Sequence, residues 1–325
     1  MSMVPDITGG DTAAELASEA GEPLPVGRKL IQGRSPWQLA WERLRHDKAA
    51  IVSMAVIAAI VIMALMAPLI AAWLGHGPNQ QFVNTGENAE GGPVPPSSTF
   101  WLGTDSSGRD LFVRIAYGAR ISLSVGVLAT LIALSLGVAF GLAAGYLGGV
   151  VDALIARVID VMLSIPFLVL AISVATIWHP SFWLVIVVVG VLSFTYPARI
   201  VRGQVISLKE KEYIQAARAL GARPLRIMFV DLLPNVIAQV IVYGSLLIPA
   251  SIVIEASLSF LGVGIPPPTA DWGQMISDAS GYYQYGYWWY LLFPSLALLI
   301  TTLAFNILGD SVRDALDPRG GGLYK

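Results

Sequence analysis

The stretch EYIQAARALGARPLRIMFVDLLPN, residues 212–235, gathers polar and basic side chains between two long apolar runs. This is unusual for the chain, because only 13% of its 325 residues are charged whereas 55% are hydrophobic. The mean hydropathy of +0.66 lies above that of ordinary soluble domains. The composition therefore indicates a membrane protein, in which this polar stretch connects two membrane-spanning segments.

Six runs without charged residues are long enough to cross about 30 Å of hydrocarbon, which takes roughly 20 helical residues. They cover residues 49–74, 121–147, 161–178, 182–198, 236–254 and 288–309. We therefore expect an all-α, polytopic membrane protein with six transmembrane helices. The remaining parts are expected to be a disordered tail at 1–33, an interfacial amphipathic helix at 34–48, an extracytoplasmic loop at 75–120, a core at 121–319 and a short tail at 320–325.

The distribution of Lys and Arg predicts the orientation of the chain. Seventeen of the 20 basic residues lie before the first run, in the connections after the second and fourth runs, or after the sixth run. The opposite set of connections holds only Arg109, Arg114 and Arg120. Because basic residues concentrate in cytoplasmic loops, both termini and residues 212–235 are expected in the cytoplasm, with the chain in the cytoplasmic membrane.

Several functional classes are disfavoured by what the sequence lacks. The six runs contain no Asp, Glu, Lys, Arg or His, which leaves a secondary carrier, a channel or an intramembrane hydrolase as weaker alternatives. The chain has no GxxxxGK[ST] phosphate loop and no cysteine, so neither a cofactor nor a metal site is expected in it. The net charge of −2 gives no sign of nucleic-acid binding. If ATP drives the protein, ATP and Mg must be held by another polypeptide.

Small residues recur every four positions along the second run. They are Ala129, Ala133, Gly137, Gly141, Gly145 and Gly149. In lipid, a ridge of small side chains lets another helix approach closely and gain van der Waals contact. The partner of this ridge is either another helix of the same chain or a second subunit.

Residues 207–224 carry local signals for two cytoplasmic helices. Ser207 and Glu210 form an S-x-x-E capping box, which predicts a helix start, and Gly221 suits a left-handed C-terminal cap. Pro224 fits the first turn of the second helix. One face of the first helix is expected to be small and mildly apolar, with Tyr213, Ala216, Ala217 and Leu220. The helix pair is either a solvated loop that only fixes topology or a docking element for a partner protein.

This stretch, about residues 207–235, resembles the EAA loop of permease subunits in bacterial ATP-binding-cassette importers. The pattern of that loop is E-A-A-x-x-x-G followed after nine residues by I-x-L-P, and it is matched here by Gln215, Ala216, Ala217, Gly221, Asp231, Leu232, Leu233 and Pro234. Two positions depart from the pattern, because Gln215 replaces the leading acid and Asp231 stands where peptide importers often carry His. The resemblance implies that the residues coupling to an ATPase are Glu212, Tyr213, Gln215, Ala216, Ala217, Arg218, Leu220 and Gly221.

Other segments narrow the resemblance to the C-type permease subunit of oligopeptide and dipeptide importers. The element GTDSSGRD within residues 102–126 is typical of that subunit, as are residues 145–172, 255–276 and 306–319. Asp105, Arg109 and Asp110 in this element are candidate loop anchors or gates. Glu255, at the outer end of the fifth run, is a further candidate gate or loop anchor, with a purely structural hydrogen bond as the alternative.

The resemblance covers residues 35–319 and implies the type I permease fold of these importers. It further implies a homologous second permease, two ATP-binding subunits, an extracytoplasmic substrate-binding protein and a peptide as cargo. Membrane lipid is expected around the spans of this chain. The residues 212–221 would rest in a groove of one ATPase and transmit its closure to the translocation path. Permeases for nickel, opines or glycosides have a similar design and stay alternatives.

Overall fold

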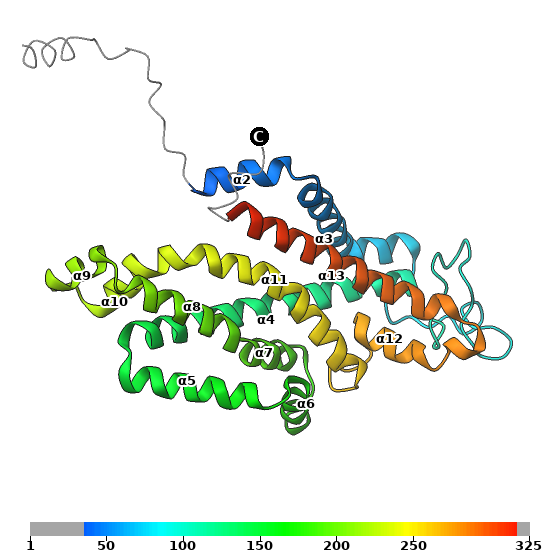
Figure 1. The fold of residues 1–325 in the computed structure, drawn as a ribbon. Coiled ribbons are helices and arrows are strands. Elements are labelled where there is room, and N and C mark those ends of the chain that lie inside the picture. Colours follow the sequence, from blue (N-terminus) through cyan, green and yellow to red (C-terminus); the bar gives the residue numbers. More distant parts are fainter. Residues whose placement is uncertain (1–35, 317–325) are drawn as a thin grey trace, which may run out of the picture.

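A computed structural model describes residues 36–316 of the chain, and Figure 1 shows their arrangement. The elements are α2 (Pro36–His46), α3 (Lys48–Leu74), α4 (Leu111–Leu147), α5 (Gly149–Ser164), α6 (Phe167–Ile177), α7 (Phe182–Ser193), α8 (Thr195–Leu208), α9 (Glu212–Ala219), α10 (Pro224–Arg226), a π-helical segment (Ile227–Leu232), α11 (Leu233–Phe260), α12 (Trp272–Ser280), a 3-10 turn (Tyr283–Tyr285) and α13 (Trp288–Leu316). The tails expected at 1–33 and 320–325 lie outside the described residues. Within residues 36–316 every regular element is helical, which confirms the all-α class.

The long helices run side by side along one axis, with two different ends (Figure 1). At one end, called the loop end, residues 75–110 and 261–287 gather around α12; at the other, the α9 end, lie α9 and α10. Five helical stretches are long and apolar enough to cross a membrane: α3, α4, α7 with α8, α10 to α11, and α13. A sixth is obtained if α5 and α6 are counted as one span.

The second membrane helix begins ten residues before the expected start, so the loop predicted at 75–120 is too long. Asp110 has extended backbone angles, and its Oδ1 accepts the N–H groups of Phe112 and Val113. A capping carboxylate satisfies N–H groups that the first helical turn leaves free. The helix therefore starts at Leu111 and includes Arg114, which a search for uncharged runs excludes from a span.

The prediction of a single straight helix for the third run is wrong. α5 and α6 meet at an angle of 92°, with Ile165 and Pro166 between them. Ile165 has extended backbone angles, φ −97° and ψ 131°, because the ring of a following proline crowds the helical conformation. The bent pair starts at Gly149, twelve residues before the expected run.

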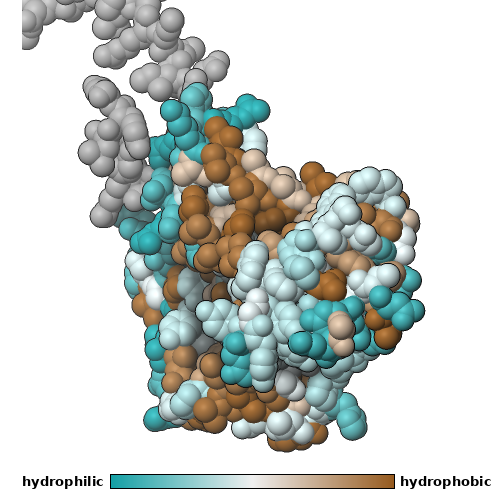
Figure 2. All heavy atoms as spheres, turned by 90° about the vertical axis from the view of Figure 1, so that its right-hand side faces the viewer, coloured by the Kyte–Doolittle hydropathy of each residue, from teal (hydrophilic) through white to brown (hydrophobic). Residues whose placement is uncertain are grey.

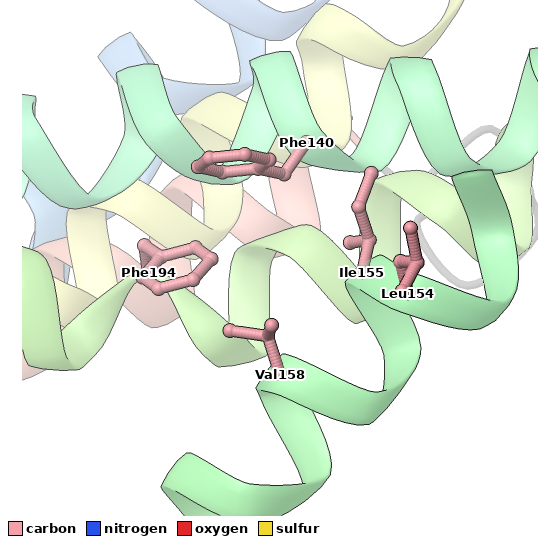
Figure 3. A pocket seen from close by; sticks show the side chains of 5 residues that line it. All are labelled: Phe140, Leu154, Ile155, Val158 and Phe194. Atoms are coloured by element: carbon pink, nitrogen blue, oxygen red, sulfur yellow. The ribbon is translucent and has the colours of Figure 1, made fainter.

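An apolar hollow of about 230 Å³ lies between α4, α5 and the junction of α7 with α8. Figure 3 shows Phe140 and Phe194 on one side of it, with Leu154, Ile155 and Val158 of α5 opposite. All five side chains are apolar. The hollow has no polar group with which to select a ligand, and its chemistry matches that of the surrounding hydrocarbon.

The ridge of small residues on α4 packs against α8 of the same chain. A Cβ atom added to any of the three ridge glycines that lie within α4 would be 2.7 Å from a side chain of α8, which is too close for a real contact, whereas Gly149, the first residue of α5, meets open space. The three contacts pair Gly137 with Pro197, Gly141 with Val201, and Gly145 with Val205. Of the two alternatives, the contacts observed are those of packing within the chain.

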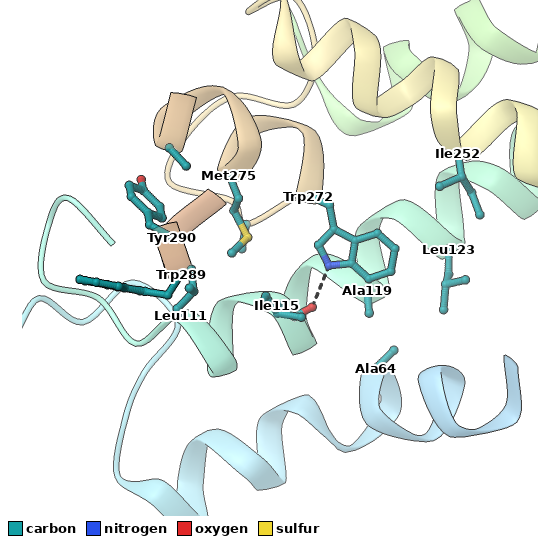
Figure 4. Close-up of a cluster of buried hydrophobic side chains, with 12 residues drawn as sticks. Ala64, Leu111, Ile115, Ala119, Leu123, Ile252, Trp272, Met275, Trp289 and Tyr290 are labelled. Carbon is teal, nitrogen blue, oxygen red and sulfur yellow. Dashed lines mark hydrogen bonds between the residues drawn. The ribbon is translucent and has the colours of Figure 1, made fainter. Parts of the chain in front are cut away.

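At the loop end, a cluster of buried apolar side chains joins α3, α4, α11, α12 and α13 (Figure 4). Trp272 of α12 is fully buried in it, and its indole Nε1 donates to the carbonyl oxygen of Ile115 at 3.1 Å. Ala64 and Ile252 bring α3 and α11 to the same cluster. α12 is therefore fixed to the membrane helices and is not a free part of the loop.

α2 is helical from Pro36 to His46 and lies against the last turns of α13. Arg43 Nη1 donates to the carbonyl oxygen of Ala315 at 3.2 Å, and Ser311 Oγ donates to Asp47 Oδ2 at 2.6 Å. Trp41 is exposed on the outer side of α2. The expected amphipathic helix is present, and its position in a membrane interface stays a prediction.

Candidate functional site

α9 is a short helix held on the bundle by one apolar side chain. Ile214 is fully buried, and it packs in a cluster contributed by α4, α8 and the helix that follows. The other buried members of this cluster are Leu142, Val201, Val205, Ile227, Met228, Leu232, Val236 and Val240. Burying an isoleucine side chain contributes roughly 2 kcal/mol, which fixes an eight-residue helix that would not be stable alone.

The start of α9 differs from the prediction. Ser207 lies inside the last turn of α8, which continues from the fourth membrane run to Leu208. A capping box needs the serine in an extended conformation, so a serine already inside a helix cannot act as its N-cap. The helix break falls at Lys211, which is extended, and α9 begins at Glu212.

The end of α9 is as predicted. Gly221 has φ +77°, and its N–H donates to the carbonyl oxygen of Arg218 at 2.9 Å. The N–H of Ala222 donates to the carbonyl oxygen of Ala217 at 3.0 Å. These two bonds form a Schellman motif, which requires a left-handed residue that glycine adopts without steric cost. Gly221 therefore turns the chain sharply from α9 toward Pro224, which occupies the first turn of α10 as expected.

The outward face of α9 is largely the one that the sequence predicts. Tyr213 and Ala216 are exposed, and Leu220 is 89% exposed, whereas Ala217 is half-buried and turned toward the Ile214 cluster. An apolar side chain as exposed as Leu220 is informative when it belongs to a contiguous set. Leu225 of α10, which lies at the same end of the molecule as α9 (Figure 1), is also exposed.

The polar residues of α9 support its position. Gln215 Nε2 donates to the carbonyl oxygen of Glu210 at 3.1 Å, which closes the turn before the helix. The guanidinium of Arg218 lies 4.8 Å from the centre of the Tyr146 ring, a cation–π contact with the end of α4. Glu212 lies in the first turn, where its charge is favourable to the helix dipole.

A π-helical segment follows α10, and no sequence pattern pointed to it. The N–H of Leu233 donates to the carbonyl oxygen of Met228, five residues earlier. Pro234 has no N–H, and its ring crowds the carbonyl oxygen of Val230. We attribute the widened turn to this crowding. Asp231 lies in the segment, and its Oδ2 is buried without a hydrogen-bond partner among residues 36–316.

The three candidates of the GTDSSGRD element lie together at the loop end. Asp105 is buried; its Oδ1 accepts the N–H groups of Ser107 and Arg109, and its Oδ2 accepts Arg109 Nε at 2.6 Å. Arg114 Nε is 3.2 Å from the same Oδ2. One carboxylate thus balances two guanidinium groups and pins the loop to the start of α4.

Asp110 makes a second anchor beside this one. In addition to capping α4, its Oδ2 lies 2.6 Å from Nδ1 of His76, and both side chains are buried. The His76 ring is stacked on Phe100 with 5.2 Å between centroids. Asp105, Arg109 and Asp110 are therefore engaged within the chain, and their geometry is that of loop anchors.

Glu255 lies apart from this group and is fully buried in α11. Its carboxylate accepts Ser122 Oγ of α4 at 3.1 Å and Ser259 Oγ at 3.2 Å. The sequence interpretation missed its neighbour Asp271, which is fully buried and close enough to interact electrostatically with Glu255. Asp271 caps α12 by accepting the N–H of Gln274, a D-x-x-Q signal that could have found it. Burial raises the pKa of Asp271 to about 6.

The outer surface of the loop end differs in hydropathy from the helices behind it. Figure 2 looks onto this end and shows mainly neutral and hydrophilic residues on the loops, with hydrophobic residues above and below. Among residues 36–316 no three His, Asp or Glu side chains converge as metal ligands do. The arrangement offers anchored loops at one end and a helix with an exposed, mildly apolar face at the other, with no assembled catalytic group among these sites.

These features are those of a polytopic helical membrane protein. The fold is similar to a chain of the MetNI methionine ABC transporter in an inward-facing conformation, with a TM-score of 0.50 at 20% identity over 62% of this chain and 96% of that one. At this identity the likeness concerns the fold alone.

Sequence comparison then gives the family. Residues 137–320 match the model for the binding-protein-dependent transport system inner membrane component, and residues 35–90 match the N-terminal transmembrane domain of oligopeptide transport permease C. The dipeptide transport system permease DppC of Bacillus subtilis is 41% identical over 87% of this chain and 85% of its own length. The oligopeptide permease OppC of Escherichia coli K12 is 40% identical over 89% and 93%. The chain belongs to the family of binding-protein-dependent transport system inner membrane components, as the resemblance predicted.

Proposed function

We propose that the chain is the permease subunit of an ATP-driven importer of oligopeptides or dipeptides. The names of the relatives support the cargo, and the anchored α9 with its exposed Leu220 supports the coupling. A homologous second permease would complete the translocation path. Two ATP-binding subunits would hold ATP and Mg and carry out hydrolysis, so this chain itself would not be an enzyme.

The observation that carries the proposal is the construction of the α9 end. The helix is tied inward by Ile214 and closed by the Gly221 turn, while Tyr213, Ala216 and Leu220 face outward. Small and apolar side chains on a rigid helix suit insertion into a groove of a second protein. A movement of that protein would pass to α8 and α11 through the apolar cluster around Ile214.

The proposal includes an orientation, with the α9 end in the cytoplasm of the cell and the loop end meeting an extracytoplasmic substrate-binding protein. Because the sequence has no cysteine, single thiols can be introduced without a background. In membranes that hold the chain without the ATP-binding subunits, Leu220→Cys should react with a membrane-impermeant maleimide only when the cytoplasmic face is open. Val83→Cys, at an exposed position of the loop end, should react in intact cells. Labelling with the opposite sidedness would contradict the proposed orientation.

The function itself is tested by reconstitution with the second permease, the ATP-binding subunits and the binding protein. Wild-type proteoliposomes should take up a tripeptide only with ATP. Leu220→Ser should lower that uptake by on the order of tenfold, as expected for an anchor at the centre of an interface, with unfolding free energy unchanged within about 0.5 kcal/mol. Val150→Ser, which alters an apolar residue on α5 that is also highly exposed, should leave uptake unchanged. ATP-independent uptake by the wild type would refute the proposal.

A further inference from the structure

A hollow of about 360 Å³ opens at the loop end beside α4. Its wall includes Tyr117, Arg120 and Ser124, which follow one face of α4, and Asn79 and Thr269 from the two loops. The volume lies at the lower end of the range of about 300–1,000 Å³ that small-molecule pockets occupy. Apolar surface with a few converging polar groups is the usual lining of such pockets.

The charge in this pocket comes from one arginine. Three basic residues belong to the loop end by sequence, and two of them, Arg109 and Arg114, share the carboxylate of Asp105. Arg120 makes no ion pair with any described acidic residue; its guanidinium lies 5.7 Å from the ring centre of Tyr117. The pocket therefore presents a positive charge that no described carboxylate of the chain neutralises.

The buried Arg114 fixes the shape of the pocket. Its Nη1 donates to the carbonyl oxygen of Pro78 at 3.1 Å and to Asn79 Oδ1 at 3.2 Å. The same nitrogen lies 3.5 Å from the carbonyl oxygen of Pro268, next to Thr269. One side chain thus holds both loop walls against α4, which places them opposite Arg120 before any ligand arrives. A preformed wall lowers the entropic cost of binding.

We propose that the Arg120 pocket binds the carboxylate of a peptide at the loop end. A guanidinium matches a carboxylate with two parallel N–H donors, and the hydroxyl groups of Ser124 and Thr269 can donate further hydrogen bonds. The ring of Tyr117 and the side chain of Ile121 offer apolar contact to the residue that carries the carboxylate. The inference rests on the proposed function and adds a subsite and a selected chemical group to it.

A concave pocket favours this ligand over an anionic lipid headgroup. A headgroup at the membrane surface needs only an exposed cation, whereas this cavity has volume beyond the guanidinium and hydroxyl groups on both walls. The two candidate ligands predict different results when the peptide carboxylate is removed. If Arg120 binds the peptide, its replacement then no longer affects uptake. If Arg120 binds a lipid headgroup, the effect of its replacement is the same with and without the peptide carboxylate.

The test uses the complete reconstituted importer with saturating binding protein, trialanine and its C-terminal amide. Arg120→Gln should lower the uptake of trialanine by on the order of tenfold, the loss expected for a hydrogen bond between charged groups. Uptake of the amide should change less than about twofold, and Arg120→Lys should retain part of the trialanine uptake, since it keeps the charge. Arg157→Gln removes an exposed arginine of α5 and is the matched control, with both peptides unaffected.

Arg120→Cys gives a second readout. Aminoethyl methanethiosulfonate adds an ammonium group at this thiol, the only one in the chain, and should restore trialanine uptake. Sulfonatoethyl methanethiosulfonate adds a negative charge and should not restore it. Equal effects of Arg120→Gln on acid and amide, or an effect that disappears when phosphatidylglycerol is replaced by phosphatidylcholine, would overturn the carboxylate subsite. No ATP-dependent uptake by the wild type would refute the proposed function and this inference with it.

Discussion

Different interactions stabilise the two ends of the bundle. At the loop end, buried charges are paired within the chain, as Asp105 with Arg109 and Arg114 shows. At the α9 end, the fully buried Ile214 anchors a helix with the support of the Arg218–Tyr146 contact, and the other face of this helix is left exposed. A charge network fixes geometry because each partner must stay satisfied, whereas an apolar anchor tolerates small shifts. We infer that the loop end is built to stay in place and the α9 end to move as a unit.

Removal of the shared carboxylate should have the largest effect on stability. Asp105→Ala leaves Arg114 buried without its acidic partner, which costs about 3–5 kcal/mol. Thermal unfolding of the purified protein should show the loss as a large drop in Tm. Glu90→Ala removes an exposed acid of the same loop and should leave Tm nearly unchanged. Equal small effects of both changes would mean that the network does not hold the loop end.

The apolar anchor of α9 should matter less for global stability and more for local order. Ile214→Ala removes a buried side chain and should cost about 2–4 kcal/mol. Hydrogen exchange of residues 212–222 should become faster, while exchange at residues 103–115 stays as in the wild type. Ala216→Ser, on the exposed side of the same helix, is the control. Faster exchange at both ends would argue against two independently held regions.

How much of the structure the sequence alone predicts depends on how far apart along the chain the interacting residues lie. The stop at Gly221 was predictable because a left-handed turn is a local property of glycine, and so was the exposed Leu220. The break at Pro166 is also local, but the hydropathy of the run concealed it. The capping box at Ser207 was misleading because the preceding helix continues through it. Arg114 lies near Pro268, 154 positions along the chain, and no local pattern predicts such a contact.

The link between the two ends is α4, which reaches from one to the other and packs closely on α8. At Gly141 an added Cβ would lie 2.7 Å from Val201 Cβ and 2.8 Å from the carbonyl oxygen of Ala198. Gly141→Ala should therefore cost about 1–3 kcal/mol through overpacking, despite the better helix propensity of alanine. Gly203→Ala on α8 meets open space and should be neutral or stabilising. The difference in Tm between the two variants measures how tightly the helices are joined.

The smallest effect is expected for a polar contact that is not deeply buried. Ser311 Oγ donates to Asp47 Oδ2 between α13 and the start of α3, and this hydrogen bond holds the pKa of Asp47 below its usual value. Because the folded-state pKa is lowered, the stabilisation is present above about pH 4 and is lost as pH falls through the folded pKa. Ser311→Ala should cost about 1 kcal/mol at pH 7 and less at acid pH. A pH-independent loss would mean that Ser311 acts through packing and not through its hydrogen bond to Asp47.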